Sequence, residues 1–305
     1  MQKLIDDAVN EVGTVLFGKE RQVRLALCCL LARGHLLIED LPGMGKTTLA
    51  NALARVLGLD YKRVQFTSDL LPADILGVSI FNKESSAFEF LPGPIFTQVL
   101  LADEINRTTP KSQSALLEAM EERQVTIDGS TRVLPSPFFV IATQNPATQS
   151  GTYPLPESQL DRFLMKISLG YPDKEAERKL YLGDDSVKKM QSLRTVITPD
   201  QLIAIQKAVD EVHASDNLLD YLERLVESTR VSEGFAFGLS PRGALALLRC
   251  AKTWALMSGR GHVVPEDIQL VLASVVDHRL SSSLDYHIDS GALSQRLLKE
   301  VAVVV

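Results

Sequence analysis

Residues 35–48 read His35-Leu36-Leu37-Ile38-Glu39-Asp40-Leu41-Pro42-Gly43-Met44-Gly45-Lys46-Thr47-Thr48, an apolar run of strand length followed by a glycine-rich loop. Leu and Ala residues with helical spacing come next. Similar apolar runs, each flanked by helical spacing, occur at 63–66, 99–102, 138–143 and 165–169. Because these runs are continuously apolar rather than alternating, they are typical of buried parallel strands covered on both faces. The sequence therefore predicts an α/β domain with a doubly wound parallel five-stranded sheet.

A second, helical domain is expected after the last of these runs. Beyond Gly170-Tyr171-Pro172-Asp173 no further strand-like run follows. Thr198-Pro199-Asp200-Gln201 combines a capping Thr, a Pro at the first helical position and a Gln at the third. Ser240-Pro241 and Val264-Pro265 repeat the signal of a Pro at a helix start. We therefore expect residues 1–170 to form the α/β domain and residues 171–305 an all-helical one.

The loop after the first apolar run has the residues that phosphate binding requires. Glycines let backbone N–H groups close on phosphate oxygens, and the following helix start adds partial positive charge. Lys46 is expected to reach the β- and γ-phosphates of a nucleotide, and the hydroxyl of Thr47 to bind Mg²⁺. The strict motif has Gly where this chain has Asp40, so that carboxylate must turn away from the phosphates. The alternative is an ordinary glycine-rich turn. The expected phosphate-binding residues are Pro42, Gly43, Met44, Gly45, Lys46, Thr47 and Thr48.

Two adjacent carboxylates, Asp103 and Glu104, follow the apolar run at 99–102. In a parallel sheet both emerge at the carboxyl edge, beside the phosphate loop. Asp103 is expected to hold Mg²⁺ through water, and Glu104 to orient and deprotonate the water that attacks the γ-phosphate. The alternative is that both carboxylates only cap the next helix.

A polar amide follows the run at 138–143, in Thr143-Gln144-Asn145-Pro146. Asn145 is placed at the same edge of the predicted sheet, where it can hydrogen-bond the attacking water or the γ-phosphate. Taken alone, an Asn before Pro is more often a turn residue. Its combination with Lys46 and the two carboxylates favours the catalytic interpretation.

The composition narrows the classes of function. The chain has 305 residues with 32 basic and 38 acidic side chains, a net charge of −6, and no run of Lys or Arg. This balance disfavours a dedicated duplex-DNA binder. Three cysteines without framework or zinc spacing indicate a reducing, cytoplasmic setting, and five scattered histidines favour no metal site. The longest apolar stretch, 25–38, is interrupted by Arg33, Gly34 and His35, so we expect no membrane span or signal sequence.

In order and spacing, five motifs resemble those of the AAA+ ATPases, and among them the MoxR family. They are Pro-Gly-Met-Gly-Lys-Thr (42–47), Leu-Ala-Asp-Glu-Ile-Asn-Arg (101–107), Ala-Thr-Gln-Asn-Pro (142–146), Leu-Asp-Arg-Phe (160–163) and Ser-Pro-Arg (240–242). The resemblance covers residues 10–280. It implies a P-loop AAA+ fold with a C-terminal helical lid. It also implies roles for single residues: Lys46 and Thr47 as the Walker A pair, Asp103 and Glu104 as Walker B, Asn145 as sensor 1, Arg162 as the arginine finger and Arg242 as sensor 2.

The two arginines bear on assembly. An arginine supplied across a subunit interface can raise hydrolysis by a factor on the order of a thousand or more, so Arg162 implies an oligomer. Without the resemblance, Arg162 pairing with Asp161 or Glu157 on the surface is the simpler interpretation. Arg242 stands in the first turn of a predicted helix, where a cation is unfavourable unless an anion is near. The alternative is a tolerated surface arginine. We expect Arg242 to couple the lid to the γ-phosphate.

Two hairpins are predicted within the α/β domain. Residues 76–90 have two short alternating runs around a polar turn, and residues 124–134 have a second pair around Asp128-Gly129. Hairpins at these places are similar to those of the helix-2-insert group of AAA+ proteins, in which they tend to face the channel of a ring. The alternative is that both are passive surface ribbons.

The resemblance implies an ATPase that uses ATP and Mg²⁺ and works as a homo-oligomer, a hexameric ring. ATP is expected between the domains, with adenine near 15–18. The family implies a chaperone-like remodeller of protein clients in metalloenzyme maturation, with a separate partner that carries a von Willebrand factor A domain. The first alternative is a nucleic-acid-directed motor or nuclease-coupled GTPase, disfavoured because Lys83, Arg123 and Arg132 are the hairpins' only nearby basic residues. A nucleotide-binding scaffold is disfavoured by Lys46 with Glu104, and a transcription activator by the missing Gly-Ala-Phe-Thr-Gly-Ala loop.

Overall fold

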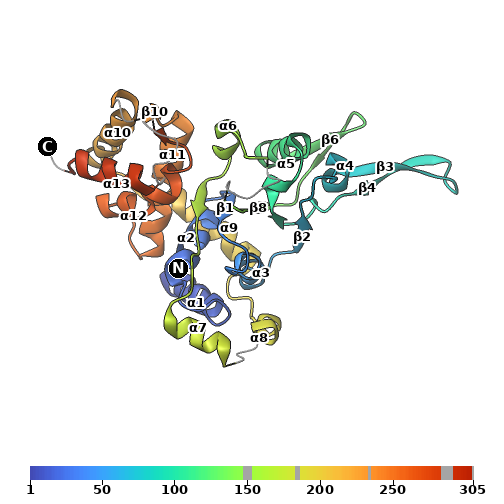
Figure 1. The fold of residues 1–305 in the computed structure, drawn as a ribbon, viewed down its shortest axis with the longest axis horizontal. Coiled ribbons are helices and arrows are strands. Elements are labelled where there is room, and N and C mark those ends of the chain that lie inside the picture. Colours follow the sequence, from blue (N-terminus) through green and yellow to red (C-terminus); the bar gives the residue numbers. More distant parts are fainter. Residues whose placement is uncertain (147–152, 183–185, 233–234, 283–290, 304–305) are drawn as a thin grey trace.

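A five-stranded parallel sheet forms the centre of the computed structural model, which describes residues 1–146, 153–182, 186–232, 235–282 and 291–303 (Figure 1). All four neighbouring strand pairs run parallel. The predicted strands are confirmed, with boundaries within two residues of those expected. Their order across the sheet is β2 (Tyr61–Gln65), β5 (Val99–Asp103), β8 (Phe139–Gln144), β1 (Leu36–Glu39) and β9 (Met165–Ile167).

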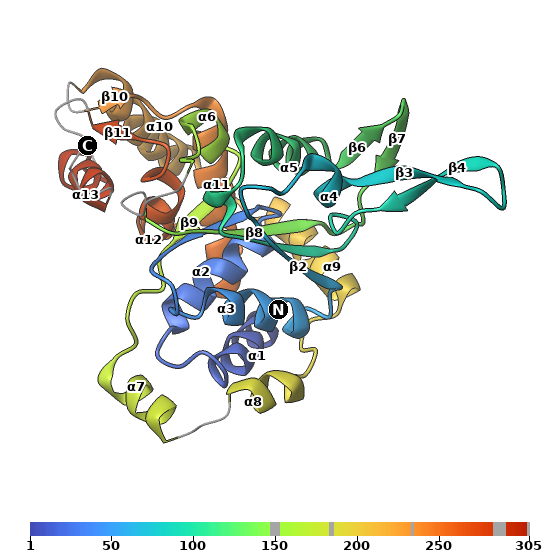
Figure 2. The same cartoon turned by 45° about the vertical axis from the view of Figure 1, so that its right-hand side comes forward.

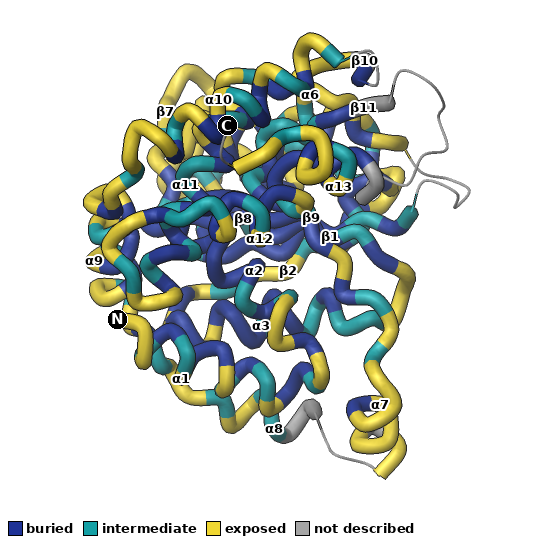
Figure 3. Tube along the Cα trace, turned by 90° about the vertical axis from the view of Figure 1, so that its left-hand side faces the viewer, coloured by how far each residue is buried: buried dark blue, intermediate teal, exposed yellow. Residues whose placement is uncertain are grey.

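Alternate residues of the central strands pack into two apolar cores, one on each face of the sheet. Leu36 and Ile38 of β1 lie in the first core and Leu37 in the second, because successive side chains point to opposite faces. The strands other than the exposed edge strand β2 are therefore largely buried between two layers, and Figure 3 shows dark-blue strands inside the trace. The first core contains residues of α1 (Gln2–Gly13), α2 (Glu20–Leu31) and α3 (Lys46–Val56), and the second those of α4 (Pro72–Leu76), η1 (Ile105–Arg107) and α5 (Pro110–Glu122).

The N-terminal stretch with helical spacing, 4–31, is divided into α1 and α2 by a connection over residues 14–19. Gly18 has a φ of +67° there, a conformation that favours glycine. A Cβ at this position would lie 2.8 Å from the carboxylate of Asp173. The connection therefore contacts the segment that follows β9.

The C-terminal half is helical, as expected, and packs against α2 and β9. Thr198 accepts a hydrogen bond from the N–H of Gln201 and Ser240 from that of Gly243, so the predicted caps are confirmed. A short antiparallel pair, β10 (Phe235–Phe237) with β11 (Ser281–Ser282), was not predicted because two or three residues carry no periodicity.

None of the helices in the described ranges is long and apolar enough to span a bilayer. The principal helices are α9 (Pro199–Asp210), α10 (Asp216–Val231), α11 (Pro241–Met257), α12 (Pro265–Val276) and α13 (Gly291–Glu300), and shorter ones are α6 (Glu157–Leu160), α7 (Lys174–Tyr181) and α8 (Ser186–Ser192). The domain boundary near residue 171 stays a prediction.

Both predicted hairpins are present and project from the same side of the molecule (Figures 1 and 2). The first pairs β3 (Gly77–Asn82) with β4 (Ala87–Pro92), and the second pairs β6 (Gln124–Ile127) with β7 (Ser130–Val133). Asp128 and Gly129 both have positive φ, 51° and 74°, as a tight two-residue hairpin turn requires.

Candidate active site

The loop between β1 and α3 has glycines at two positions where φ is positive. Gly43 and Gly45 have φ of +84° and +92°, which other residues adopt only at a cost. Lys46, the first residue of α3, is only 8% exposed. Its Nζ donates to the backbone carbonyl of Asp40 at 2.5 Å and to Oδ1 of Asn145 at 3.0 Å. Burial lowers the pKa of Lys46, although the carboxylates of Asp40 and Asp103 oppose that shift.

Asp40, the departure from the strict phosphate-loop motif, points its carboxylate toward the segment after β9. Its Oδ2 accepts hydrogen bonds from the N–H groups of Leu169 and Gly170, both at 2.7 Å, and from the hydroxyl of Ser168 at 3.0 Å. Its Oδ1 accepts from the N–H of Leu41 at 2.9 Å. Four donors thus satisfy this buried carboxylate. Asp40 ties the first residue of the loop to the end of β9.

The two acidic residues at the end of β5 are held by a hydroxyl from the neighbouring strand. Thr143 of β8 donates from Oγ1 to Oδ1 of Asp103 at 2.6 Å, and the same oxygen accepts from the N–H of Glu104 at 2.8 Å. Sequence analysis missed this role of Thr143. The available signal was its place one residue before the end of β8, at the edge where the other site residues gather.

Glu104 and Asn145 are brought together as predicted. Asn145, which is 1% exposed, donates from Nδ2 to Oε1 of Glu104 at 3.0 Å. Gln65 of β2 donates to Oε2 at 2.9 Å, and Arg107 forms an ion pair with the same oxygen at 3.1 Å. Glu104 has a φ of +58°, an unfavourable conformation for a residue with a Cβ and one that is common at functional sites. A continuous chain of hydrogen bonds therefore joins Lys46, Asn145 and Glu104.

The oxygen donors at this edge fit a hard divalent cation. Thr47 offers a hydroxyl and Asp103 a carboxylate, the ligand types that Mg²⁺ prefers when phosphates and water complete its shell. Within the described ranges no group of three His, Cys, Asp or Glu side chains could hold a metal alone. Such a set suits an ion that arrives with a nucleotide. The Oδ2 of Asp103 accepts from Nη2 and Nε of Arg63 at 2.6 and 3.0 Å, a contact that sequence analysis also missed.

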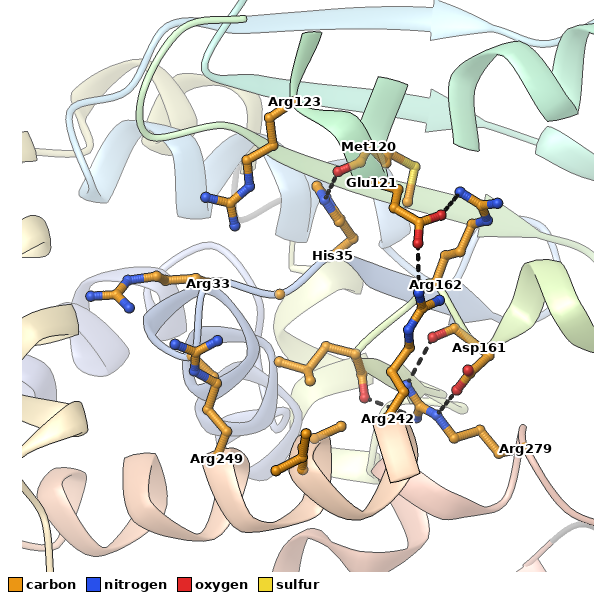
Figure 4. Close-up of a pocket in the computed structure, with 15 residues that line it drawn as sticks. Arg33, His35, Met120, Glu121, Arg123, Asp161, Arg162, Arg242, Arg249 and Arg279 are labelled. Atoms are coloured by element: carbon orange, nitrogen blue, oxygen red, sulfur yellow. Dashed lines mark hydrogen bonds and ion pairs between the residues drawn. The ribbon is translucent and has the colours of Figure 1, made fainter. Parts of the chain in front are cut away.

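Arg162 and Arg242 lie together, and both bind Glu121 at the end of α5 (Figure 4). Arg242 donates to Oε1 of Glu121 at 2.5 Å, and Arg162 pairs with Oε2 of the same carboxylate. The sequence alternative for Arg162 placed it on Asp161 or Glu157. In the structure its ion pair is with Glu121, and Asp161 binds Arg279.

Arg242 lies apart from the phosphate loop of its own chain, and its expected coupling of the lid to the γ-phosphate stays a prediction. Arg162 and Arg242 line a pocket of about 520 Å³ together with Gly34 and His35, which precede β1. Lys46 follows the opposite end of β1. The reason is the docking of the lid helices on α2 and β9, which sets Arg242 beside Arg162 instead of beside the phosphate loop.

The pocket is strongly cationic. Two carboxylates, Glu121 and Asp161, face six guanidinium groups, and Asp210 pairs with two of those six, on Arg33 and Arg249. Burial lowers the pKa of His35 to about 4, so this ring adds no charge at neutral pH. Such a pocket favours an anion. The six arginines are Arg33, Arg123, Arg162, Arg242, Arg249 and Arg279.

Known proteins resemble this chain over almost its full length. The family model described as "ATPase family associated with various cellular activities (AAA)" matches residues 35–165, and the AAA lid domain model matches residues 227–299. The Bacillus subtilis protein YeaC is 47% identical over 92% of this chain and 88% of its own length. Chaperone MoxR1 of Mycobacterium tuberculosis is 40% identical over 98% of this chain and 80% of its own. A crystal structure from Cytophaga hutchinsonii superposes with a TM-score of 0.90 at 37% identity, covering 99% of this chain and 95% of the other. On these similarities, together with the phosphate loop, the paired carboxylates and the lid, the chain belongs to the MoxR family of AAA+ ATPases.

Proposed function

We propose that this protein binds ATP with Mg²⁺, hydrolyses it to ADP and phosphate, and uses the cycle to remodel protein complexes as a ring of identical subunits, a hexamer. The observation that carries the proposal is the chain of hydrogen bonds from Lys46 through Asn145 to Glu104. It supports the proposal because it joins the ammonium of Lys46, the amide of Asn145 and the carboxylate of Glu104 at one edge of the sheet. A scaffold that only bound nucleotide would have no need of the base.

Each residue of the site has a chemical role in this proposal. The N–H groups of 43–48 and the ammonium of Lys46 bind the phosphates. Thr47 and Asp103 would hold Mg²⁺, which supplies positive charge against the phosphate oxygens. Glu104 accepts a proton from the attacking water, and Asn145 orients both that water and the carboxylate. Adenine is placed near 15–18, since Leu16 lies 2.9 Å from where a Cβ of Gly45 would be.

The positions of Arg162 and Arg242 support the proposal that the subunits assemble into a ring. Arg162 and Arg242 stand at the end of β1 away from their own phosphate loop, in a pocket with excess positive charge. We assign both to the phosphates of a neighbouring subunit. A guanidinium supplied in this way stabilises the charge that develops on the γ-phosphate and contributes a rate factor on the order of a thousand or more. Glu121 holds the two arginines side by side until an anion competes for them.

The first hairpin supports a polypeptide client. Phe81 and Phe88 are 54% and 75% exposed and pack edge to face at 5.4 Å, with further exposed apolar side chains beside them. Its charged residues are Lys83, Glu84 and Glu89, which give a net charge of −1. An apolar, slightly acidic ribbon suits contact with a protein and repels a phosphate backbone. On the ground of the family resemblance, we include in the proposal a partner with a von Willebrand factor A domain and a role in metalloenzyme maturation.

Phosphate release by the purified protein tests the proposal. We expect Mg²⁺-dependent hydrolysis of ATP in the wild type and its loss in Glu104→Gln. A protein with a von Willebrand factor A domain should stimulate turnover, and DNA should not. Absence of Mg²⁺-dependent ATP binding would overturn the ATPase assignment. Stimulation by DNA alone would instead favour the nucleic-acid motor.

A further inference from the structure

Arg279, three residues beyond α12, reaches from the lid into the loop that carries Arg162. Its side chain is 4% exposed, and its Nε donates to Oδ1 of Asp161 at 2.7 Å. Its Nη2 donates to the carbonyls of Phe163 and Asp161 at 2.7 and 3.3 Å, and its Nη1 to that of Leu164 at 3.2 Å. Four hydrogen bonds from one guanidinium therefore bind the three residues that flank Arg162.

The same loop is also fixed by His278 of the lid and by the segment that precedes β1. The Nε2 of His278 lies 3.0 Å from the carbonyl of Phe163, and the N–H of Leu164 donates to the carbonyl of His35 at 2.9 Å. Leu164 packs so closely on Gly34 that a Cβ there would approach it to 2.1 Å. The loop has little freedom of its own, and its position follows from the lid and from β1 together.

Arg279 is also packed against the start of α11, which carries Arg242. A Cβ at Gly243, the residue after Arg242, would lie 3.2 Å from Cδ of Arg279. The two lid arginines are therefore neighbours, and Figure 4 shows both at the pocket with Asp161 and Arg162. A movement of the lid displaces Arg242 directly and Arg162 through the contacts of Arg279.

We propose that Arg279 is a positioning residue that makes the lid of one subunit set the arginine offered to the next subunit. The inference rests on the proposed function, since it requires that Arg162 act on a neighbour's nucleotide. Simple docking of the lid would need only the ion pair with Asp161. Three further bonds go to backbone carbonyls on both sides of Arg162, which only the planar fork of an arginine can reach together, and Nη1 also donates to the carbonyl of Val275 in α12.

The experiment mixes variant subunits. Arg279→Ala is expected to bind ATP with unchanged affinity and to lose about 10- to 100-fold in kcat, because its Arg162 is misplaced. Mixing with Lys46→Ala subunits, which cannot bind ATP but keep an intact arginine loop, should restore part of the activity. Mixing with Arg162→Ala subunits should restore none, since neither partner offers a placed arginine. Arg279→Lys should behave like Arg279→Ala, because a lysine keeps the charge but not the fork.

A matched control separates positioning from stability. Arg260 makes a bidentate ion pair with the buried Asp267 at 2.5 and 2.6 Å, also within the lid. Arg260→Ala is expected to lower the Tm while kcat per folded protein stays near that of the wild type. If Arg279→Ala does not fold, Arg279→Lys takes its place in the mixtures, because a lysine keeps the charge that faces Asp161 and lacks the fork that reaches the backbone carbonyls.

Two results would overturn the inference and are distinguishable. If Arg162→Ala is rescued by Lys46→Ala subunits but Arg279→Ala is not, Arg279 serves only its own subunit, and the proposed function survives. If Arg162→Ala is not rescued either, the action across an interface fails, and this inference fails with it. Size-exclusion chromatography of each mixture establishes that the subunits assemble.

Discussion

The Nζ atom of Lys46 lies 3.0 Å from Oδ1 of Asn145, although 99 positions separate the two residues in the chain. The amide of Asn145 uses its other end to hold Glu104. The side chain of Asn145 thereby contacts both the proposed phosphate-binding Lys46 and the proposed base Glu104. Removing different members of this series of hydrogen bonds should have different effects on binding and turnover, so substitutions can separate their roles.

Loss of the lysine should strongly weaken nucleotide binding. Lys46→Ala removes the buried ammonium that we propose binds the β- and γ-phosphates, so the ATP affinity is expected to fall by about 100-fold, the range of a lost charge-assisted contact. Titration with a fluorescent ATP analogue measures this. Lys62→Ala, an exposed lysine on β2, serves as the control and should bind like the wild type. Equal affinity in Lys46→Ala and Lys62→Ala would refute the assignment of the loop.

Loss of the base should stop turnover without affecting binding. Glu104→Gln keeps the hydrogen bond to Asn145 within reach but cannot take a proton, so we expect kcat to fall by about 10²- to 10⁴-fold. The ATP affinity should stay within about a factor of three of the wild type, since the substituted group accepts a proton only during reaction. Steady-state phosphate release and nucleotide titration together test both statements. Equal turnover in the two proteins would show that another group is the base.

If Arg162 and Arg242 act on the nucleotide of a neighbouring subunit, mixed assemblies should show rescue that arginines acting within their own chain would not give. Arg242→Ala subunits, like Arg162→Ala subunits, should bind ATP normally and hydrolyse it about a thousandfold more slowly. Both should be partly rescued by Lys46→Ala subunits, because the two arginines share Glu121 at one pocket. Rescue of Arg162→Ala without rescue of Arg242→Ala would place Arg242 on its own subunit's nucleotide.

Asp40 should matter for stability even though the strict motif has glycine at its position. Asp40→Gly removes a buried carboxylate that accepts four hydrogen bonds, and it leaves the N–H groups of Leu169 and Gly170 without that acceptor. We expect the free energy of unfolding to fall by about 1–3 kcal/mol, measured by urea denaturation. Asp40→Asn, which keeps one acceptor oxygen, should lose less. An Asp40→Gly protein as stable as the wild type would show that the tie to β9 contributes nothing.

Asp277 makes stability depend on pH. Burial raises the pKa of Asp277 from its ordinary 3.8 to about 6, while hydrogen bonds from Ser294 and the charge of Lys166 oppose this. The folded protein therefore holds this proton more tightly than the unfolded chain, and stability is lost as the pH rises from about 4 through 6. Asp277→Asn should be more stable than the wild type at pH 8 by on the order of 1–3 kcal/mol, and nearly equal at pH 4. Urea denaturation at both pH values measures the difference; a constant difference would contradict the raised pKa.

The strands, helix starts, hairpins and phosphate loop could be predicted because their signals are local. Apolar runs, capping residues and glycines act over a few positions, and the edge of a parallel sheet then brings Lys46, Glu104 and Asn145 together. Thr143 and Gln65 were missed because their roles arise from contacts with neighbouring strands, and for Thr143 the only available signal was its place near the end of β8. The place of Arg242 beside Arg162 was not predicted, for a similar reason. It depends on how the lid docks on β9, which is set by many weak apolar contacts far apart in the chain.

The short strand β9 joins the segment that Asp40 binds to the loop that Arg279 binds. Its N-terminal side continues from the loop gripped by Arg279, and its C-terminal side meets the carboxylate of Asp40. Three residues of strand measure only about 10 Å, and hydrogen bonds to β1 stiffen them. Because β9 is hydrogen-bonded to β1, a shift of the segment at Asp40 is expected to move the loop that carries Arg162 as well. If the proposed function holds, the nucleotide state of one subunit would then bear on the position of the arginine that it offers to the next.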